Sequence, residues 1–416
     1  MEVATKNRTV PKLRFKEFDG EWGKTQLKFI GEYVGGGTPK TSVLEYWEGN
    51  IPWISSSDII ENDIHNINVQ KYITEDAIKN SATKKIPANS LIIVSRVGVG
   101  KFAINKKEVC TSQDFTNIII DTKVFDANFS AFNLLKNIDI LFNISQGTSI
   151  KGFTIVDLKK TRLSFPSLPE QQKIASFLTS VDKKIQQLTK KAEGLAQYKK
   201  GVMQQVFKQE LRFKIENEDG ELVDAPKWEQ KKLGKLFERV TTKNIENNTN
   251  VLTISAQQGL INQEEYFNKS VSAKDVSGYY LINKNDFAYN KSYSKGYPMG
   301  ATKRLTRYDK GVVSTLYICF RMKVNNDLGF YDQYFNSGFL NHELSKIAQE
   351  GARNHGLLNV SVVEFFKDIN LPTPVVEEQT KIANFLTSID KRIEQANTQL
   401  AQTQEFKKGL LQQMFV

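Results

Sequence analysis

The chain has 416 residues, of which 40% are hydrophobic, and a formal net charge of +11. That length predicts two or three domains, and the hydrophobic content is enough for buried cores. No apolar run approaches the roughly 20 residues of a membrane span, and the N-terminal stretch MEVATKNRTVPKLRFKEF lacks the apolar region of a secretory signal. Cys110 and Cys319 are far apart, which argues against a disulfide framework and fits a reducing cytoplasm.

The first segment, residues 1–168, is predicted to be a globular domain that mixes helices and strands. It has short apolar runs such as SLIIVS (90–95) and TNIII (116–120) between glycine-rich turns. Residues 84–107 hold six lysines and arginines and no acid. Lysine and arginine neutralise phosphates, so such a stretch can form a nucleic-acid surface, but a single stretch is better interpreted as a solvated face.

Within that basic stretch, SLIIVSRVGVGKFA has the form of a strand followed by a glycine-rich nucleotide loop. A dinucleotide-binding turn needs a helix next, but the INKKEVCTSQDF that follows has turn and strand character. No Ser or Thr follows Lys101, which argues against a P-loop. We therefore expect a structural hairpin beside a DNA-binding surface.

A long amphipathic helix is predicted for residues 169–210. Apolar residues recur every seven positions from Ile174, and a second apolar set follows four residues after members of the first. This spacing is typical of a coiled-coil seam, and Pro169 marks the start of the helix. The seam of this copy contains Ile174, Leu178, Val181, Ile185 and Leu188.

Residues 211–375 form a second predicted globular domain that is weakly related to the first. The tetrapeptide LRFK occurs at 13–16 and again at 211–214. Residues 281–310 hold seven lysines and arginines against two acids, with four tyrosines interleaved. Two basic stretches at comparable places in a duplication favour nucleic-acid binding over two unrelated solvated faces.

The last segment, residues 376–416, repeats the first long helix. EQTKIANFLTSIDKRI lies 208 residues after EQQKIASFLTSVDKKI, and about half of the positions in the full copies are identical. Lys199 and Lys407 interrupt the two seams at matching places; such residues can fix register, but we favour the interpretation that they snorkel at a helix end. The seam of this copy contains Ile382, Leu386, Ile389, Ile393 and Leu400.

Two helices with one apolar stripe each bury those stripes most simply against each other. The segment between the helices must leave and return, which favours antiparallel packing. The predicted fold class is therefore α/β, with two globular domains that form a pseudo-repeat, separated and joined by two long helices in an antiparallel coiled coil. Such a repeat presents two equivalent helix surfaces, to which two copies of one partner can bind.

Sequence motifs of catalysis and metal binding are missing. His65, His342 and His355 have no metal-ligand spacing, and no GxSxG, HExxH or paired Cys/His pattern occurs. The Asn-Pro-Pro-aromatic tetrapeptide of amino-methyltransferases and a PD…(D/E)xK nuclease pattern are also missing. We therefore expect no catalytic residue, no metal ligand and no bound cofactor in this chain.

Four features resemble the DNA specificity subunit of Type I restriction-modification enzymes. GGGTPKTSVLEYWEGNIPWISSSDI (35–59) is similar to a signature of that family, as is QGTSIKGFTIVDLKKTRLSFPSLPEQQKIASFL (146–178). EGARNHGLLNVSVVEFFKDINLPTPVVEEQTKIANFL (350–386) partly copies the second stretch, and the helix-terminated duplication is the fourth feature. VLTISAQQGLINQEEYF (251–267) departs from the first signature, which fits two domains that read different half-sites.

The resemblance implies that each globular domain is a target recognition domain for one half of a bipartite, asymmetric site in double-stranded DNA. The helices would space the two domains and dock two modification subunits, which carry S-adenosylmethionine and methylate adenine. Restriction subunits that use ATP and Mg would join them, in the cytoplasm and in host defence.

The basic stretches and the family's end-of-domain stretch supply candidate DNA contacts. Lysines and arginines would hold phosphates, while amides and aromatic rings would reach bases or sugars. The candidates are Lys40, Arg96, Lys101, Ser149 and Lys151 in the first domain, and Asn290, Lys291, Tyr293, Lys295, Arg304 and Arg353 in the second.

Two other functions stay open at this point. A self-contained DNA methyltransferase or nuclease could carry duplicated recognition domains, although the missing motifs argue against it. A coiled-coil adaptor could bind protein only, although the matched basic stretches argue against that.

Overall fold

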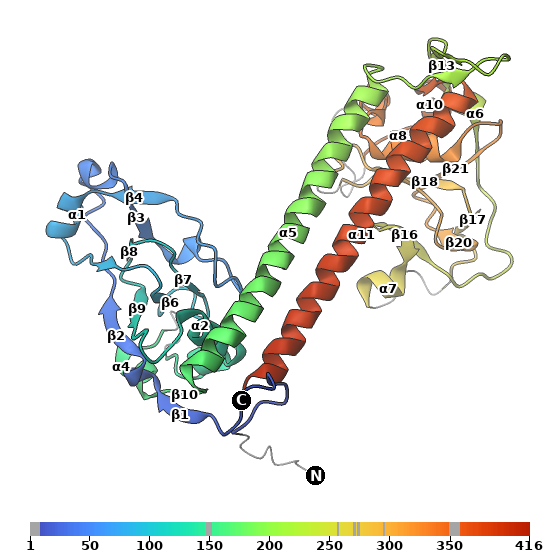
Figure 1. Cartoon of the computed structure of the whole chain (residues 1–416). Helices are drawn as coiled ribbons and strands as arrows, with labels where there is room; N and C mark the ends of the chain where they lie inside the picture. Colours follow the sequence, from blue (N-terminus) through green and yellow to red (C-terminus); the bar gives the residue numbers. More distant parts are fainter. Residues whose placement is uncertain are drawn as a thin grey trace. The chain divides into compact units, whose positions relative to one another are not determined.

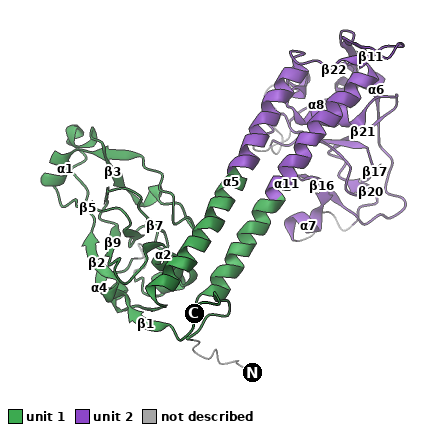
Figure 2. Ribbon diagram, in the orientation of Figure 1, with its two compact units in different colours: residues 1–189, 398–416 green, residues 190–397 purple. Residues whose placement is uncertain are grey.

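The computed structural model describes residues 9–146, 152–255, 258–268, 272, 275–293, 296–348 and 358–416. The chain divides into two compact units (Figure 2). Unit 1 contains residues 1–189 and 398–416, and unit 2 contains residues 190–397. Each unit combines one globule with part of both long helices, which confirms the predicted α/β pseudo-repeat. The four segments predicted from the sequence follow one another along the chain, whereas each unit groups residues that pack together in space.

The two long helices are α5 (Leu168–Phe207, 40 residues) and α11 (Val376–Met414, 39 residues) (Figure 1). In unit 1 the first half of α5 packs against the last turns of α11, and in unit 2 the second half of α5 packs against the first half of α11. The helices therefore run antiparallel within each unit, as predicted from the two apolar stripes.

The predicted seam residues lie inside the units. Fully burying one such aliphatic side chain is worth about 1.5–3 kcal/mol, so the seam is a large share of what holds the helices together. Buried are Ile174, Leu178, Val181, Leu188, Ile382, Leu386 and Ile389, and half-buried are Ile185, Ile393 and Leu400.

In the part of the unit 1 globule that the structure describes, the strands form two four-stranded sheets with the orders β2-β9-β6-β7 and β4-β3-β8-β5, and β1 pairs with β10. Its strands are β1 Gly23–Gln26, β2 Gly31–Gly35, β3 Ile51–Ile54, β4 Lys71–Ile73, β5 Lys85–Ile86, β6 Leu91–Val94, β7 Phe102–Ile104, β8 Val109–Thr111, β9 Phe115–Ile120 and β10 Arg162–Phe165. Its helices are α1 Glu75–Lys79, α2 Ala127–Lys136, α3 Asp139–Asn143 and α4 Ile155–Lys160, with 3-10 turns at Leu27–Phe29, Leu44–Trp47 and Ser56–Asp58.

The described residues of the unit 2 globule form one four-stranded sheet of order β14-β21-β18-β19 and four strand pairs, β11-β12, β13-β22, β15-β16 and β17-β20. Its strands are β11 Ile215–Glu216, β12 Leu222–Val223, β13 Glu229–Lys232, β14 Phe237–Arg239, β15 Leu252–Ser255, β16 Gly259–Asn262, β17 Tyr280–Asn283, β18 Phe287–Asn290, β19 Ala301–Arg304, β20 Lys310–Val313, β21 Ile318–Met322 and β22 Asn370–Thr373. Its helices are α6 Leu233–Leu236, α7 Gln263–Phe267, α8 Leu328–Asn336, α9 Leu340–Ile347 and α10 Val362–Lys367.

The two globules share a topology that extends the sequence repeat. The sheet β2-β9-β6-β7 corresponds to β14-β21-β18-β19, and the pair β1-β10 corresponds to β13-β22. In each sheet the last two strands form an antiparallel hairpin, β6–β7 in unit 1 and β18–β19 in unit 2. The SLIIVSRVGVGKFA stretch is the first of these hairpins, which confirms the expected hairpin.

Both cysteines lie in the cores. Cys110 and Cys319 are free thiols, and burial raises the pKa of Cys110 to about 11 and the pKa of Cys319 to about 12. Both thiols are therefore neutral and poor nucleophiles at neutral pH. Within the described ranges, the structure contains no helix long and apolar enough to cross a membrane.

Candidate nucleic-acid interface

A buried glutamate fastens the start of each long helix to its own globule. Glu170 is 1% exposed and accepts hydrogen bonds from Arg14 Nε at 2.8 Å and Nη2 at 2.7 Å. Glu378 is fully buried and accepts from Arg212 Nε at 2.7 Å and Nη2 at 2.9 Å. These bidentate arginine–glutamate ion pairs combine charge with fixed geometry, so they fix the direction in which each long helix extends from its globule.

The glutamine that follows each glutamate makes a second link. Gln171 accepts from the amide of Asp126 at 3.0 Å, and Gln379 accepts from the amide of Asp327 at 2.9 Å. Asp126 and Asp327 are the N-caps of α2 and α8, so the glutamine ties the long helix to the start of a globule helix.

Sequence reasoning noted both the repeated Glu-Gln and the repeated LRFK, but it did not connect them. The structure shows that the arginine of LRFK and the glutamate of Glu-Gln are partners in both units. This part of the repeat is therefore explained by contacts inside the chain.

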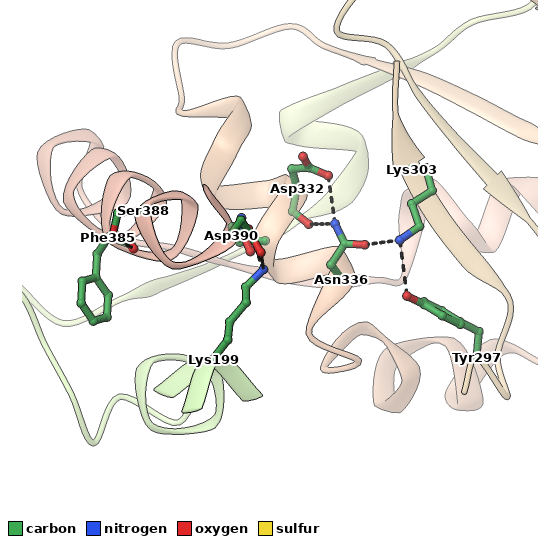
Figure 3. Close-up of polar contacts among 9 residues, drawn as sticks. Lys199, Tyr297, Lys303, Asp332, Asn336, Phe385, Ser388 and Asp390 are labelled. Carbon is green, nitrogen blue, oxygen red and sulfur yellow. Dashed lines mark hydrogen bonds and ion pairs between the residues drawn. The ribbon is translucent and has the colours of Figure 1, made fainter. Parts of the chain in front are cut away.

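The two lysines that interrupt the seams are held in ion pairs. Lys199 Nζ lies 2.7 Å from both carboxylate oxygens of Asp390, and Lys407 Nζ lies 2.7 Å from Asp182 Oδ1 (Figure 3 shows the first pair). The lysine side chains are only 16% and 13% exposed. The prediction that they snorkel into solvent is wrong, because each meets a carboxylate on the other helix before it reaches water.

In unit 1, Arg96 and Lys101 lie together in the loop of residues 95–101 that joins β6 to β7. Arg96 is exposed and Lys101 is half-buried. The amides of Ser95 and Arg96 both donate to the Asp114 carbonyl, at 2.7 and 3.2 Å. The start of this loop is therefore hydrogen-bonded to residue Asp114, which keeps the two cations in place.

Lys40 lies in a different loop, which also borders the segment of residues 112–114. Lys40 is exposed, and the nearby Thr38 hydroxyl hydrogen-bonds the Gln113 side chain, one residue before Asp114. Ser149 and Lys151 fall outside the described residues, but Gly152 pairs with Arg96 in an isolated β-bridge. The structure thus places Lys40, Arg96 and Lys101 in two loops that flank residues 112–114.

In unit 2, Asn290, Lys291 and Tyr293 lie at the corresponding β18–β19 hairpin. The Asn290 side chain accepts from the Ser292 amide at 3.0 Å, and the Lys291 carbonyl accepts from the Leu358 amide at 3.0 Å. Tyr293 is 55% exposed. Lys295 and Arg353 fall outside the described residues, so the structure does not place these two candidates.

Arg304, the last residue of β19, turns toward α8. Its Nε lies 3.7 Å from Asp332 Oδ2, and its side chain is 21% exposed. The neighbouring Lys303 is buried and donates to the side chain of Asn336 at 2.5 Å and to the Tyr297 hydroxyl at 3.4 Å (Figure 3). Both cations thus have protein partners, and DNA contact by Arg304 stays a prediction.

A polar cavity of about 580 Å³ lies beside these side chains in unit 2. Burial raises the pKa of the Asp332 carboxyl, although the nearby Arg304 and Lys303 favour its charged form. The cations exceed the carboxylates in the lining, so the cavity is basic. Its charged lining residues are Lys199, Lys200, Lys303, Arg304, Asp332 and Asp390.

The described ranges contain no group of three or more His, Cys, Asp and Glu side chains placed to hold a metal ion. His65 Nε2 lies 3.2 Å from Asp182, and its ring meets Phe132 edge-on at 5.7 Å. His342 is on α9 beside Glu343. The cations around the hairpins suit binding of a polyanion.

The chain thus contains two globules of the same topology. Each globule carries a basic hairpin and is bound to one helix of an antiparallel pair, which is the architecture of a binding protein built by duplication. The model of the Type I restriction modification DNA specificity domain matches this chain twice, over residues 19–196 and 226–404. The chain therefore belongs to that family.

Three curated specificity subunits are similar to this chain. The Type I restriction enzyme MjaIX specificity subunit of Methanocaldococcus jannaschii is 33% identical over 234 residues, which are 54% of each chain. The EcoR124I/EcoR124II specificity subunit of Escherichia coli is 35% identical over 176 residues, which are 41% of this chain and 43% of that one. The chain thus spans about half the length of these two relatives. The MjaVIII specificity subunit of M. jannaschii is 23% identical over 95% of this chain and 94% of its own.

Two solved structures share the fold. The Type I restriction-modification S subunit from M. genitalium superposes with a TM-score of 0.61 at 16% identity, over 98% of this chain and 99% of that one. A chain from a study of complex assembly and conformational transition of the type I R-M system superposes with a TM-score of 0.51 at 14% identity, over 94% and 96%.

Proposed function

We propose that this chain is the non-catalytic specificity subunit of a Type I restriction-modification complex. Each globule reads one half of a bipartite, asymmetric site in double-stranded DNA, and the helix pair docks partner subunits. The supporting observation is the recurrence of one basic hairpin, β6–β7 and β18–β19, at the same place in two globules of the family fold.

The hairpins offer the two kinds of contact that DNA recognition needs. Arg96, Lys101 and Lys291 are cations that can hold phosphates, and Asn290 and Tyr293 offer an amide and a ring for bases or sugars. The hairpin loops differ in length and sequence, which is expected of readers of two different half-sites. We keep Lys40 and Arg304, together with Ser149, Lys151, Lys295 and Arg353, as further candidates.

Exposed residues shared by the two helix copies support two identical partners. Lys183, Gln187 and Gln412 are exposed in unit 1, and their counterparts Lys391, Gln395 and Gln204 are exposed in unit 2. At one further matched position an exposed aromatic ring recurs, Phe406 in unit 1 and Tyr198 in unit 2, at 55% and 51% exposure.

Burial in the core does not explain why these exposed residues recur in both helix copies. Binding of the same partner to both copies would explain it. We propose that each unit docks one modification subunit through this set. These subunits would bring S-adenosylmethionine, and restriction subunits that use ATP and Mg would complete the assembly in the cytoplasm.

Mapping of methylated adenines in cells with and without this chain tests the proposal. The expected result is a set of bipartite sites that loses methylation only when the chain is deleted. Methylation by the isolated chain would instead favour a self-contained methyltransferase, and an unchanged methylation map together with no DNA binding would favour a protein-only adaptor.

Salt-dependent DNA binding by the assembled complex tests the hairpins themselves. Lys101→Ala and Lys291→Ala should each weaken binding and lower the slope of log affinity against log salt by about one. Lys24→Ala, an exposed lysine on β1, is the control that should leave the slope unchanged. Wild-type slopes in both hairpin variants would contradict the assignment.

A further inference from the structure

Val97, in the β6–β7 loop, adopts a backbone conformation that valine ordinarily avoids. Its φ is +46°, in the left-handed region where a branched Cβ crowds the backbone. The other described non-glycine residues with positive φ are asparagines and Gln209, and asparagine is among the residues that tolerate this region best. Among the residues that the structure describes, Val97 is therefore the one β-branched residue in this region, where a branched Cβ is most strained.

Packing of the side chain does not compensate for this strain. Val97 is 55% exposed, so its isopropyl group gains little from burial. Glycine or asparagine would adopt the same backbone with less strain. A strained conformation persists only where the surroundings over-determine it, and such residues cluster at functional sites.

The surroundings hold the loop from both sides. At its start, Ser95 and Arg96 are clamped to the Asp114 carbonyl, and at its end the Lys101 carbonyl accepts from the Val94 amide at 2.9 Å. Gly100 has a φ of +100°, and a Cβ there would lie 2.6 Å from the Phe142 ring. The loop is thus held in one conformation, in which the apolar side chain of Val97 at its tip is exposed to solvent.

Cations flank this tip on both sides. Arg96 precedes Val97 directly and is exposed, and Lys101 closes the loop. The corresponding β18–β19 hairpin also exposes a large side chain, Tyr293, two residues after Lys291. An exposed side chain with apolar surface beside lysine or arginine is therefore a shared feature of the two hairpins.

We propose that Val97 contacts the C5-methyl group of one thymine in the major groove of the first half-site, while Arg96 and Lys101 hold phosphates beside it. The thymine methyl is the apolar group that the major groove presents. Valine has no hydrogen-bonding group, and its side chain is shorter than the Phe, Leu, Ile and Met side chains that wedge between base pairs. Val97 is then a specificity-determining residue, an inference that rests on the proposed DNA-reading function.

Replacing thymine by uracil removes only the methyl group and so tests this contact. The assembled complex is bound to duplexes of its mapped site in which each thymine is replaced by uracil in turn. One replacement should weaken wild-type binding on the order of tenfold. Val97→Gly and Val97→Asn should bind the unmodified site as weakly as the wild type binds that uracil duplex, and the same replacement should not weaken them further.

Stability separates the proposed contact from a structural role. Both variants should unfold at the wild-type temperature or above, because they relieve the φ strain. Val124→Asn, a change at a similarly exposed valine (51%), is the matched control and should keep wild-type binding and sensitivity to uracil.

Two results would overturn the inference while leaving the proposed function intact. One is wild-type affinity in both Val97 variants; the other is an equal loss at every uracil position in the wild type and the variants. If the wild-type complex shows no preference for its mapped site, the proposed function itself fails.

Discussion

Lys199 on α5 holds Asp390 on α11 through both carboxylate oxygens at 2.7 Å, and the same pair recurs with the copies exchanged, as Lys407 on α11 and Asp182 on α5. An apolar heptad seam by itself permits neighbouring registers that differ by seven residues. A slip of that size would place Lys199 opposite Ala383 or Asn397, without a carboxylate. The ion pairs therefore select one register among those that the seam allows.

Removing the carboxylate from this pair should cost more stability than replacing the lysine by an apolar residue. Asp390→Ala leaves the ammonium of Lys199, which is only 16% exposed, without its partner, and should lower the free energy of unfolding by about 1–2 kcal/mol. Lys199→Met should cost less, because Asp390 is 42% exposed and can be hydrated. Urea denaturation measures both, with Lys391→Ala as the control; equal losses in the two variants would contradict this account.

The glutamate at the start of α11 should be more sensitive to change than the one at the start of α5. Glu378 accepts from Trp228 Nε1 at 2.8 Å as well as from Arg212, whereas Trp22 Nε1 has no hydrogen-bond partner among the described residues. Glu378→Gln should destabilise by about 3 kcal/mol, and Glu170→Gln, its matched control, by less. Hydrogen exchange of the β13–β22 and β1–β10 pairs compares the two; greater loosening in the Glu170 variant would refute the ranking.

The exposed aromatic residues of the two units should each control one docking event. Tyr198→Ala and Phe406→Ala each remove a ring that is exposed in this chain and would become buried in the complex, so each should lower the number of bound modification subunits from two to one. The double variant should bind none. Native mass spectrometry counts the subunits, with Phe142→Ala, an exposed ring of the unit 1 globule, as the control. Two bound subunits in the double variant would rule out this surface.

Exchange of the first globule should change one half-site only. Replacing residues 1–168 by the matching segment of a relative should alter one half of the methylation site and leave the other intact. Phe415 packs against Trp22 at 6.1 Å and Phe129 at 5.2 Å, so the exchange should fold better when residues 410–416 come from the same relative. Methylation mapping reads the result; a change in both halves, or in neither, would defeat the modular interpretation.

Lengthening both helices should lengthen the unspecified spacer of the DNA site. Insertions of four residues after Leu188 and after Ala396 lie beside the boundary between the units and leave both Lys–Asp pairs intact. Four helical residues add about 6 Å, which is less than two base pairs, and keep the seam almost in phase. Methylation mapping should find the same specified bases with a longer spacer.

A matched insertion of one or two residues is the control, because it should swing the seam off its partner and weaken folding. If the four-residue variant still methylates sites with the original spacing, the helices do not set the spacing, and docking of partner subunits is the role that is left for them.

The elements with local signatures were predictable from the sequence. Ile174 and Leu178 reveal α5 because helical periodicity repeats within a few residues. The duplication revealed α11 in the same way, and the turn and strand character after Lys101 indicated the β6–β7 hairpin. The basic stretches also pointed to the two hairpins, because charge is a property of composition.

Only the tertiary structure decided the contacts between distant residues. Arg14 and Glu170 are 156 positions apart, and Lys199 and Asp390 are 191 apart, so no local pattern pairs them. The same is true of Arg304 beside Asp332 and of the Asp114 carbonyl, which holds Ser95 and Arg96 next to Val97. Periodicity determines which face of an element is buried, whereas side-chain partners depend on which surfaces the folded chain brings within hydrogen-bonding distance.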